Sequence, residues 1–352
     1  MNLAENNRRL IRIFLSKSNS SKALKSLQQS ITDGNVSQVE NYYSAITESE
    51  FEEEYAKLQK LSAEYLTILD PIYPALLKQI YDPPPILIIK GNRDLLARPK
   101  IAIIGGRNAG YSYLNFVTEI ANFLSSLGFV VVSGLANGID TYAHIGAGAG
   151  NTIAVIASGI DICYPRQNYK LYQEIQNQGL VISESRVGMP PKANLFPRRN
   201  RIIVGLSKSV IASNVKIKSG SILTCRLAVE NNRELIILPG APNDIQHSGS
   251  NKLIRDGAMI FTNLDDLGSH LCNIYDSCLD ISTPLAPRKI IAPKLQNSNF
   301  QNIIKMIPAD GILIEELSSM SKIICNQLIG MISEMELDDL IYVDSTKRIF
   351  LK

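Results

Sequence analysis

The stretch that decides the fold is Ile101-Ala-Ile-Ile-Gly-Gly-Arg-Asn-Ala-Gly110, in which an apolar run ends in a glycine-rich turn. Four consecutive apolar residues are typical of a strand that is buried on both faces of a sheet. The following segment, residues 111–127, carries apolar residues at helical spacing. The sequence therefore predicts a strand, a tight turn and a helix, in this order.

The same pattern recurs five times further along the chain. Each apolar run ends at small or polar residues, and the runs are 129–132, 153–156, 180–182, 209–212 and 235–238. Apolar strands that alternate with helices predict an α/β fold with a parallel sheet covered by helices on both faces. Open sheets of this class bind ligands at the carboxyl edge, where helix N-termini attract phosphate.

The segments on either side of this pattern differ from it in composition. Residues 1–69 are polar with helical apolar spacing, which continues over 50–69 and predicts a small helical domain. The sheet domain is assigned to 70–272, with a proline-rich lead-in and a short strand at 86–90. Loss of the pattern and three further prolines predict a linker over 273–299.

Residues 300–352 are predicted to form a separate unit. Three short helical runs, 303–307, 312–317 and 323–335, precede two strands around Asp344, which is the order of a winged helix. Residues 301–352 hold five Lys and Arg against eight Asp and Glu, a net charge of −3. Because such a surface repels a phosphate backbone, we expect this winged-helix-like domain to contact protein rather than DNA.

Positive charge is concentrated around Asn194-Leu-Phe-Pro-Arg-Arg-Asn-Arg201. No Asp or Glu occurs from Ser185 to Val229, although the window holds nine basic residues: Arg186, Lys192, Arg198, Arg199, Arg201, Lys208, Lys216, Lys218 and Arg226. Cations neutralise phosphates, and a ring such as that of Phe196 stacks on any base. The pattern favours a single-stranded nucleic acid as partner. A solvated basic loop, or arginines paired with carboxylates elsewhere in the fold, is the alternative.

Composition narrows the class of protein. The 352 residues are 45% hydrophobic and 20% charged, with a net charge of +3. No apolar run reaches the ~18 residues that a membrane span needs, and the N-terminus lacks an apolar signal core, so we expect a cytoplasmic protein with no membrane contact. Five scattered Cys and three distant His predict neither a disulfide framework nor a metal site.

Known cofactor motifs are not matched. The glycines of 105–110 depart from Gly-x-Gly-x-x-Gly, and no acidic residue follows a second strand to hold a ribose. The Walker pattern Gly-x4-Gly-Lys-Ser/Thr does not occur either. We therefore expect no nicotinamide, flavin or ATP cofactor.

Two local constellations have both a functional and a structural interpretation. Asp140 and His144 share a helix face, as an acid/base pair would, but no Ser or Cys nucleophile is identifiable beside them, so we expect them to brace the loop. The run Lys218-Ser-Gly-Ser221 is an anion-binding loop at a helix N-terminus or a simple helix cap. Lys218 favours phosphate there.

Taken together, these motifs resemble one family, the bacterial DNA-processing protein A (DprA/Smf) family. The matching pieces occur in the family's order over about 170 residues, namely Gly105-Gly-Arg-Asn-Ala, Ser133-Gly-Leu-Ala-Asn-Gly-Ile-Asp-Thr-Tyr-Ala-His, Ser158-Gly-Ile-Asp-Ile-Cys-Tyr-Pro, Asn194-Leu-Phe-Pro-Arg-Arg-Asn-Arg-Ile-Ile, Lys218-Ser-Gly-Ser-Ile-Leu-Thr and Leu238-Pro-Gly. Each piece is weak alone, and the set is specific.

The resemblance implies an extended Rossmann fold that binds single-stranded DNA and loads the RecA recombinase during natural transformation. It also implies a homodimer through the Rossmann domain and no catalysis. The DNA pocket would be lined by Arg107, Phe196, Arg198, Arg199, Arg201 and Lys218, and the strand-end and loop residues Ser133, Gly134, Asn200, Ser219 and Gly220 complete the candidate site.

Two departures from the family pattern matter. Gly106 stands where the family has a Ser, which removes one hydroxyl contact but leaves Arg107. The N-terminal region lacks the glycines of a helix-hairpin-helix, which leaves its role open.

Two other functions compete with DNA binding. Nucleotide phosphoribohydrolases have similar Rossmann sheets and carry Pro-Gly-Gly-x-Gly-Thr-x-x-Glu at a strand end. This chain has Pro239-Gly-Ala-Pro there, and residues 220–230 match the motif only loosely. A scaffold that binds no DNA is the third possibility, and the acid-free window argues against it.

Overall fold

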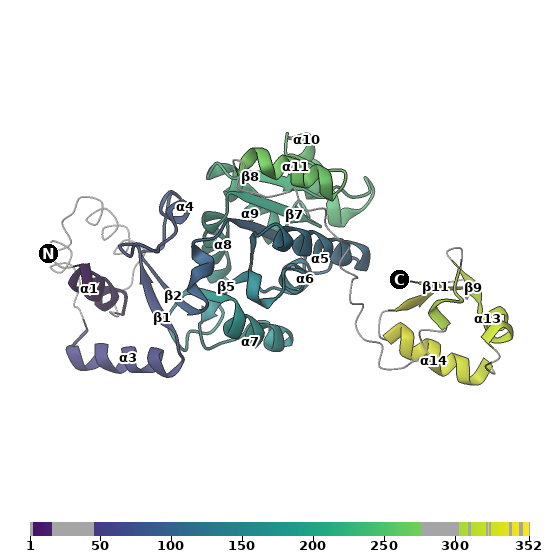
Figure 1. The fold of residues 1–352 in the computed structure, drawn as a ribbon, viewed down its shortest axis with the longest axis horizontal. Coiled ribbons are helices and arrows are strands. Elements are labelled where there is room, and N and C mark those ends of the chain that lie inside the picture. The colour runs from purple at the N-terminus through teal and green to yellow at the C-terminus, as the bar shows by residue number, and fades with distance from the viewer. Residues whose placement is uncertain are drawn as a thin grey trace. The chain divides into compact units, whose positions relative to one another are not determined.

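The computed structural model describes residues 3–15, 46–275, 303–308, 311–321, 323, 325–337, 340–344 and 348–351 (Figure 1). The chain divides into two compact units, Met1–Asp280 and Ile281–Lys352. The helical runs expected between residues 16 and 45, and the linker from residue 276 to 299, lie outside the described residues.

An eight-stranded sheet forms the core of the first unit. Its strand order is β1-β2-β6-β5-β4-β3-β7-β8. The six strands from β6 to β8 in this order are all parallel, which confirms the predicted Rossmann-like parallel sheet, whereas β1 and β2 add to it antiparallel. The strands are β1 (Glu64–Thr67), β2 (Ile86–Gly91), β3 (Lys100–Gly105), β4 (Val130–Ser133), β5 (Thr152–Gly159), β6 (Leu180–Ser185), β7 (Ser209–Ser213) and β8 (Glu234–Ile237).

Helices cover both faces of the sheet, because alternate residues of each apolar strand point to opposite faces. In β3, Ile101 and Ile103 pack with helices of one face, and Ala102 and Ile104 pack with those of the other. The first face carries α5 (Tyr111–Ser126), α6 (Ile139–Ala147), α7 (Tyr169–Gln178) and α11 (Leu264–Ile274). The second carries α4 (Ala75–Lys78), α8 (Leu195–Leu206) and α9 (Gly220–Glu230).

Apart from the two N-terminal helices, the remaining elements of this unit are short. They are α10 (Ser248–Arg255) and the 3-10 turns η3 (Arg93–Leu96), η4 (Ala149–Asn151), η5 (Arg166–Asn168) and η6 (Ile245–His247). In the described part of the chain, no helix has both the length and the apolar character to cross a membrane.

The N-terminal helices pack against the antiparallel edge of the sheet. Leu10 and Phe14 of α1 (Leu3–Leu15) share a core with Phe51 of α3 (Glu48–Lys60) and Ile86 of β2. Figure 1 shows β1 and β2 running from these helices into the sheet. The helical prediction for residues 61–69 is wrong, because α3 ends at Lys60 and β1 follows. Ser62 has a left-handed φ of 53°, which breaks the helix, and pairing with β2 then overrides the apolar spacing.

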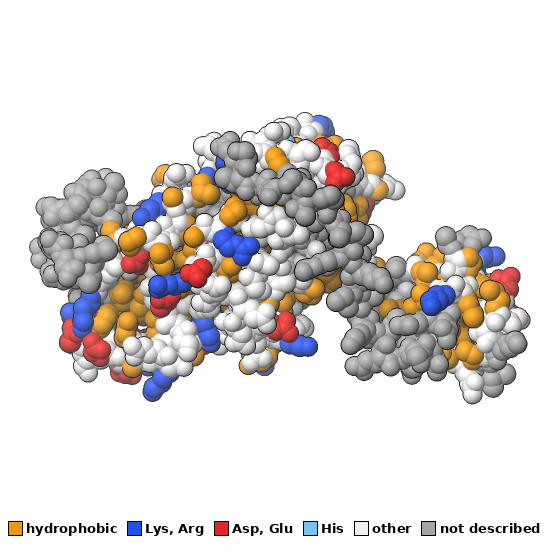
Figure 2. All heavy atoms as spheres, in the orientation of Figure 1, with side chains coloured by type: hydrophobic (Ala, Val, Ile, Leu, Met, Phe, Trp, Pro, Cys, Tyr) orange, Lys and Arg blue, Asp and Glu red, His pale blue; other side chains and the backbone are white. Residues whose placement is uncertain are grey.

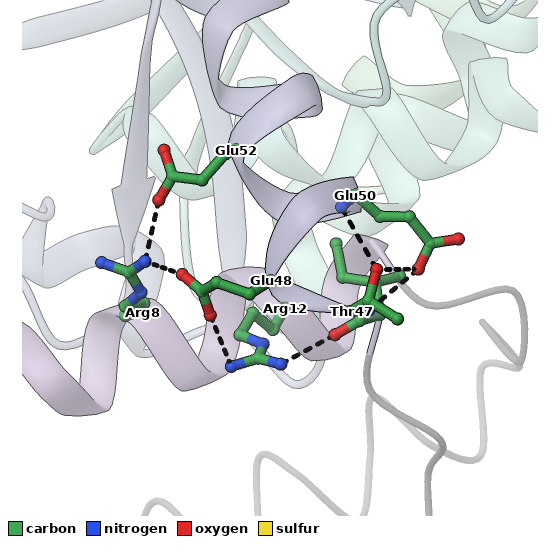
Figure 3. Close-up of polar contacts among 7 residues, drawn as sticks. Arg8, Arg12, Thr47, Glu48, Glu50 and Glu52 are labelled. Atoms are coloured by element: carbon green, nitrogen blue, oxygen red, sulfur yellow. Dashed lines mark hydrogen bonds and ion pairs between the residues drawn. The ribbon is translucent and has the colours of Figure 1, made fainter.

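Ion pairs join the two N-terminal helices (Figure 3). Arg8 of α1 lies against Glu48 and Glu52 of α3, and Arg12 pairs with Glu48 at 3.1 Å. Thr47 and Glu50 form a capping box that begins α3. Figure 2 shows acidic and basic side chains mixed over this end of the unit. The predicted boundary at residue 69 stays a prediction, and β1 lies on its N-terminal side.

The second unit has its own core around Leu317, Leu328 and Ile341. The predicted hairpin is present, because Ile341 pairs with Leu351 and Val343 with Ile349. Residues 312–313, expected to begin a helix, instead form a strand that pairs with residues 348–349. The elements are β9 (Ile312–Leu313), α13 (Ile314–Ser321), α14 (Cys325–Leu337), β10 (Ile341–Val343) and β11 (Arg348–Leu351). The winged-helix assignment stays a prediction.

Candidate nucleic-acid interface

A groove of about 430 Å³ opens at the carboxyl edge of the sheet. The strand order reverses beside β3, since β4, β5 and β6 follow on one side and β7 and β8 on the other. The loops after β3 and β7 therefore diverge, as they do at the ligand sites of open α/β sheets. Both loops, α8 and the N-terminus of α9 line the groove.

The loop after β3 contributes Gly106 and Arg107. A Cβ on Gly106 would stand 2.2 Å from Oδ1 of Asn214 and 2.6 Å from its carbonyl oxygen. A Ser in this backbone would require Asn214 to move, which gives a steric account of the departure from the family pattern. Arg107 is exposed, and its guanidinium carbon lies 5.8 Å from the Phe196 ring centroid. It forms no ion pair with another described residue, so its charge is available to an anion.

The loop after β7 contributes Asn214 and Lys216. The Asn214 side chain is 2% exposed, and its Nδ2 lies 3.4 Å from Nε2 of His247. Because Nδ1 of His247 donates to the Asp244 carboxylate at 2.8 Å, Nε2 is the acceptor for Asn214. Oδ1 of Asn214 has no partner among the described residues and lies beside the groove. Lys216 lines the groove, whereas Lys218 is exposed outside it.

The N-terminus of α9 closes this side of the groove. Oγ of Ser219 accepts a hydrogen bond from the Ile222 amide at 3.3 Å, so Ser219 caps the helix. Ser221 donates to the Gly105 carbonyl at 2.6 Å and ties the two loops together. The exposed Gly220 has nothing within 4 Å of its Cβ position. Ser219 therefore acts as a helix cap, and the positive end of the α9 dipole also faces the groove, where it can attract an anion.

The basic stretch 194–201 is not a loop, because α8 begins at Leu195. Arg199 and Asn200 lie three and four residues after Phe196, and all three face the groove. Arg199 is 7% exposed, and its Nη1 donates to the carbonyls of Gly134 and, at 2.7 Å, Val155. Burial lowers the pKa of Arg199, and the charge of Asp140 opposes this shift. Arg199 thus holds the groove wall as well as lining it.

Arg198 and Arg201 lie on other faces of α8 and are paired with acids. Arg198 contacts Glu184 at 3.1 Å, and the 11% exposed side chain of Arg201 contacts both Glu184 and Asp82. Residues 185–229 contain no Asp or Glu, but Glu184 of β6 lies close enough in the fold to pair with the arginines of this window. For these two arginines the structure shows the carboxylate pairing that the sequence left open.

The end of β4 and the residues after it hold the groove wall in place. Ser133 is fully buried, and its hydroxyl donates to the Ile103 carbonyl at 2.6 Å. Oδ2 of Asp140 accepts from the Gly134 amide at 3.2 Å, and burial raises the pKa of Asp140. A Cβ on Gly134 would lie 2.3 Å from Arg199 Nη1, so any side chain here would displace the buried guanidinium of Arg199.

His144 joins two strands beneath this wall. Its Nδ1 lies 2.6 Å from the hydroxyl of Thr152, which itself donates to the Val131 carbonyl at 2.7 Å. Nδ1 is therefore the protonated nitrogen. Burial lowers the pKa of His144 to about 3. These contacts support the structural interpretation of Asp140 and His144, which stays a prediction.

A second, smaller cavity of about 50 Å³ adjoins the groove and shares Arg107, Phe196 and Arg199 with it. Tyr164 lines its other side, with its ring edge-to-face to Phe196 at 5.9 Å and 67°. Tyr164 and Asn214 were not predicted as site residues, and Lys216 was named only as one of nine basic residues of the acid-free window. Tyr164 lies in the motif of residues 158–165 and Lys216 lies two residues before Lys218, but no pattern in the sequence showed that either side chain faces the groove.

The candidate residues separate into three groups. The two adjoining cavities are lined by Arg107, Gly134, Phe196, Arg199, Asn200, Ser219 and Gly220. Arg198 lines a small side cavity together with Glu184. Ser133, Arg201 and Lys218 line none of these cavities. Across the described ranges, no three His, Cys, Asp or Glu side chains come together as a metal site would require.

An open, mainly parallel sheet with a polar groove at its switch point defines a Rossmann-like protein of the ligand-binding kind. Within that class, the chain belongs to the family of DNA recombination-mediator protein A, whose family model matches residues 64–271. This match covers the sheet, the groove and the N-terminus of α9, and it confirms the family to which the sequence motifs pointed.

Relatives and solved structures agree with this assignment. DNA processing protein DprA of Streptococcus pneumoniae is 40% identical over 227 residues, which span 64% of this chain and 78% of that protein. Its X-ray structure matches with a TM-score of 0.64 at 35% identity, covering 76% of this chain and 98% of that one. A structure of DNA processing protein A from Helicobacter pylori, described for its single-stranded DNA binding mode, matches with a TM-score of 0.56 at 33% identity. The match covers 60% of this chain and 96% of that one.

Proposed function

We propose that this protein binds single-stranded DNA in the groove between the β3 and β7 loops and acts in DNA processing without catalysis. The observation that carries the proposal is the placement of two cations, Arg107 and Lys216, along one groove with the aromatic ring of Phe196. Cations meet the phosphates and the ring meets a base, which is how single strands are held without sequence preference.

The relatives support the same class of ligand. The family description names a recombination mediator, and the Helicobacter pylori structure concerns single-stranded DNA. Of the residues carried over from the family, Arg107, Phe196, Arg199, Asn200, Ser219 and Gly220 line the groove, and Gly134 supports its wall. We assign the DNA contact to these residues together with Lys216, and we give Ser133 and Arg201 structural roles.

A binding titration tests the proposal. Fluorescence anisotropy with a labelled dT oligonucleotide and a blunt duplex of the same length, at several salt concentrations, compares the two ligands. We expect strong preference for the single strand and a linear fall of log affinity with log salt. Equal affinity for the duplex and the dT strand would refute single-strand binding by this groove.

An enzymatic function is tested in parallel. The alternative is release of a free base from a nucleotide, as phosphoribohydrolases do. We expect no free base when the protein is incubated with nucleoside monophosphates. Release of base that Asp140→Asn abolishes, in a protein that still melts cooperatively, would favour the enzyme.

Three further properties belong to the proposal through the family. They are loading of RecA onto the bound strand during recombination or natural transformation, a homodimer through the sheet domain, and a cytoplasmic location. The description as a recombination mediator supports the first. Strand exchange by RecA on DNA coated with single-strand-binding protein tests it, and light scattering after gel filtration tests the dimer.

A further inference from the structure

We propose that Tyr164 is a second stacking surface for a nucleobase, placed across the small cavity from Phe196. The inference rests on the proposed function and adds to it a residue and a ligand geometry. It starts from Tyr164, an aromatic residue that is 46% exposed beside the groove, in a loop with hydrogen bonds on both sides of it.

The loop that carries Tyr164 is braced on both sides. Before it, the Ser158 hydroxyl donates to the Ile162 carbonyl at 2.7 Å. After it, Nδ2 of Asn168 donates to the Leu135 carbonyl and the Thr141 hydroxyl, both at 2.9 Å. These hydrogen bonds hold the loop on both sides of Tyr164, and the edge-to-face contact with Phe196 orients its ring while the residue stays partly exposed. A ring fixed in this way loses little conformational entropy when it contacts a ligand.

The surroundings of the two rings differ. The guanidinium carbons of Arg107 and Arg199 lie 5.8 and 5.9 Å from the centroid of Phe196, so cations already occupy much of the space around that ring. No Lys or Arg of the described residues takes such a position over Tyr164. Tyr164 consequently offers the less occupied ring of the pair.

The size of the cavity fixes how a base would bind. About 50 Å³ holds only a few water molecules, which is too little for a nucleobase. A base therefore lies across the mouth on the exposed ring of Tyr164, with Phe196 beneath its edge. Arg107 lines the same cavity and the main groove, which places it to meet the phosphate next to that base.

The first test separates base contacts from phosphate contacts. Tyr164→Ala and Tyr164→Phe are titrated with a dT oligonucleotide and with an abasic oligonucleotide of the same length, which has the phosphates but no bases. We expect Tyr164→Ala to weaken binding to the dT strand by about 5- to 150-fold, with an unchanged salt slope. Tyr164→Phe keeps the ring and should stay within about twofold of the original protein, because the stacking face remains.

On the abasic strand, all three proteins should bind equally. An equal loss of affinity for both strands would overturn the inference, because it would show damage to the groove rather than a lost stacking surface. Tyr169→Ala is the matched control, since Tyr169 is 54% exposed but lines neither cavity. It should bind the dT strand like the original protein.

A second test reads the contact directly through fluorescence. The chain contains no Trp, so the variants Tyr164→Trp and Tyr169→Trp each carry a single indole reporter, at the proposed site and at the control position. Emission is followed while each variant is titrated with the dT strand and with the abasic strand. We expect the dT strand to quench the Tyr164→Trp variant and the abasic strand to quench it little, because only a base can stack on the indole. The Tyr169→Trp variant should respond weakly to both strands.

Unquenched fluorescence of the Tyr164→Trp variant, at concentrations where anisotropy shows the dT strand bound, would overturn the stacking role alone. Failure of the original protein to bind the dT strand at all would instead refute the proposed function. The two failures are therefore distinguishable.

Discussion

At the scale of single residues, the environment of each arginine decides what it can do. Arg107 is exposed beside Phe196, Arg199 is buried on two backbone carbonyls, and Arg201 is paired with two carboxylates. All three have the same charge and were predicted to contact DNA. Arg107 has no ion pair with another described residue, Arg199 lines the groove while it holds two backbone carbonyls, and the ion pairs of Arg201 help to hold the protein together.

A crossed pair of variants tests this division. Arg107→Ala should flatten the log–log salt dependence of single-strand binding by roughly 0.7, because one phosphate contact is lost, and leave the melting temperature unchanged. Arg201→Ala should lower the melting temperature, since it leaves the 11% exposed Glu184 with one partner fewer, and keep the slope. Anisotropy titrations and thermal melts measure both. The opposite result would assign the DNA contact to Arg201.

His144 predicts a pH dependence of stability. Burial lowers its pKa from 6.5 to about 3, so between these values the unfolded chain binds a proton that the folded protein does not. Stability attributable to this group is therefore present above about pH 6.5 and is lost as the pH falls, by about 1.4 kcal/mol per pH unit. Replacement by Gln keeps a donor for Thr152 but cannot titrate.

As the pH falls from 6.5 to 5, we expect the free energy of unfolding of His144→Gln to decrease by about 2 kcal/mol less than that of the original protein. Asp140, whose raised pKa acts in the opposite sense, is present in both proteins. Urea unfolding at each pH measures the free energy of unfolding. Parallel curves for the two proteins would contradict the assignment of the shift to His144.

The chemistry of the site could be predicted from the sequence, but the partners of its residues could not. A basic window with Phe196 indicated phosphates and bases, and the groove contains both kinds of side chain. Glu184 lies one residue outside the acid-free window and neutralises Arg198 and Arg201 through the fold. Such a contact depends on where the end of β6 lies relative to α8, and the local sequence carries no information about this placement.

At the scale of elements, helix α8 explains why the basic stretch divides. Successive residues of a helix point about 100° apart, so neighbours in the sequence face different surroundings. Phe196, Arg199 and Asn200 reach the groove, whereas Arg201 reaches Glu184. Pro197 in the first turn is compatible with this helix, since the first amides have no intrahelical partner.

The loop before α9 gives a prediction of its own. Lys216 lines the groove and Lys218 does not, although the sequence pointed to Lys218. Lys216→Ala should flatten the salt slope by roughly 0.7, and Lys218→Ala should change it less, because a phosphate in the groove lies nearer to Lys216. Anisotropy titrations of the two variants side by side decide the matter. A larger effect of Lys218→Ala would show that the strand leaves the groove over the α9 N-terminus.

Most elements of the sheet followed from their apolar runs, and the exceptions have physical reasons. The run 101–104 lies within β3, and the run 209–212 lies within β7. Residues 64–67 were assigned to a helix because their apolar spacing continues that of α3. Their strand conformation comes from pairing with β2, a contact that exists only in the folded chain.

At the scale of the whole molecule, the two compact units make separate predictions. Removal of the residues after Asp280 leaves the unit that contains the groove and should leave single-strand affinity within about twofold, because residues 301–352 carry a net charge of −3 and repel phosphate. Anisotropy on the dT strand compares the truncated and full chains. Loss of most of the affinity would place part of the DNA site in the C-terminal unit.

The pairing of β2 with β6 has a consequence for the order in which the protein can assemble on a ribosome. Gly91 of β2 pairs with Leu180 of β6, so nearly ninety residues must be synthesised before β2 finds its neighbour. Until then the edge of β2 that will face β6 has no partner strand, like the outer edge of β1, and exposed edges of this kind promote association between chains. We therefore expect nascent chains that stop before residue 180 to be the form of this protein that most needs a chaperone.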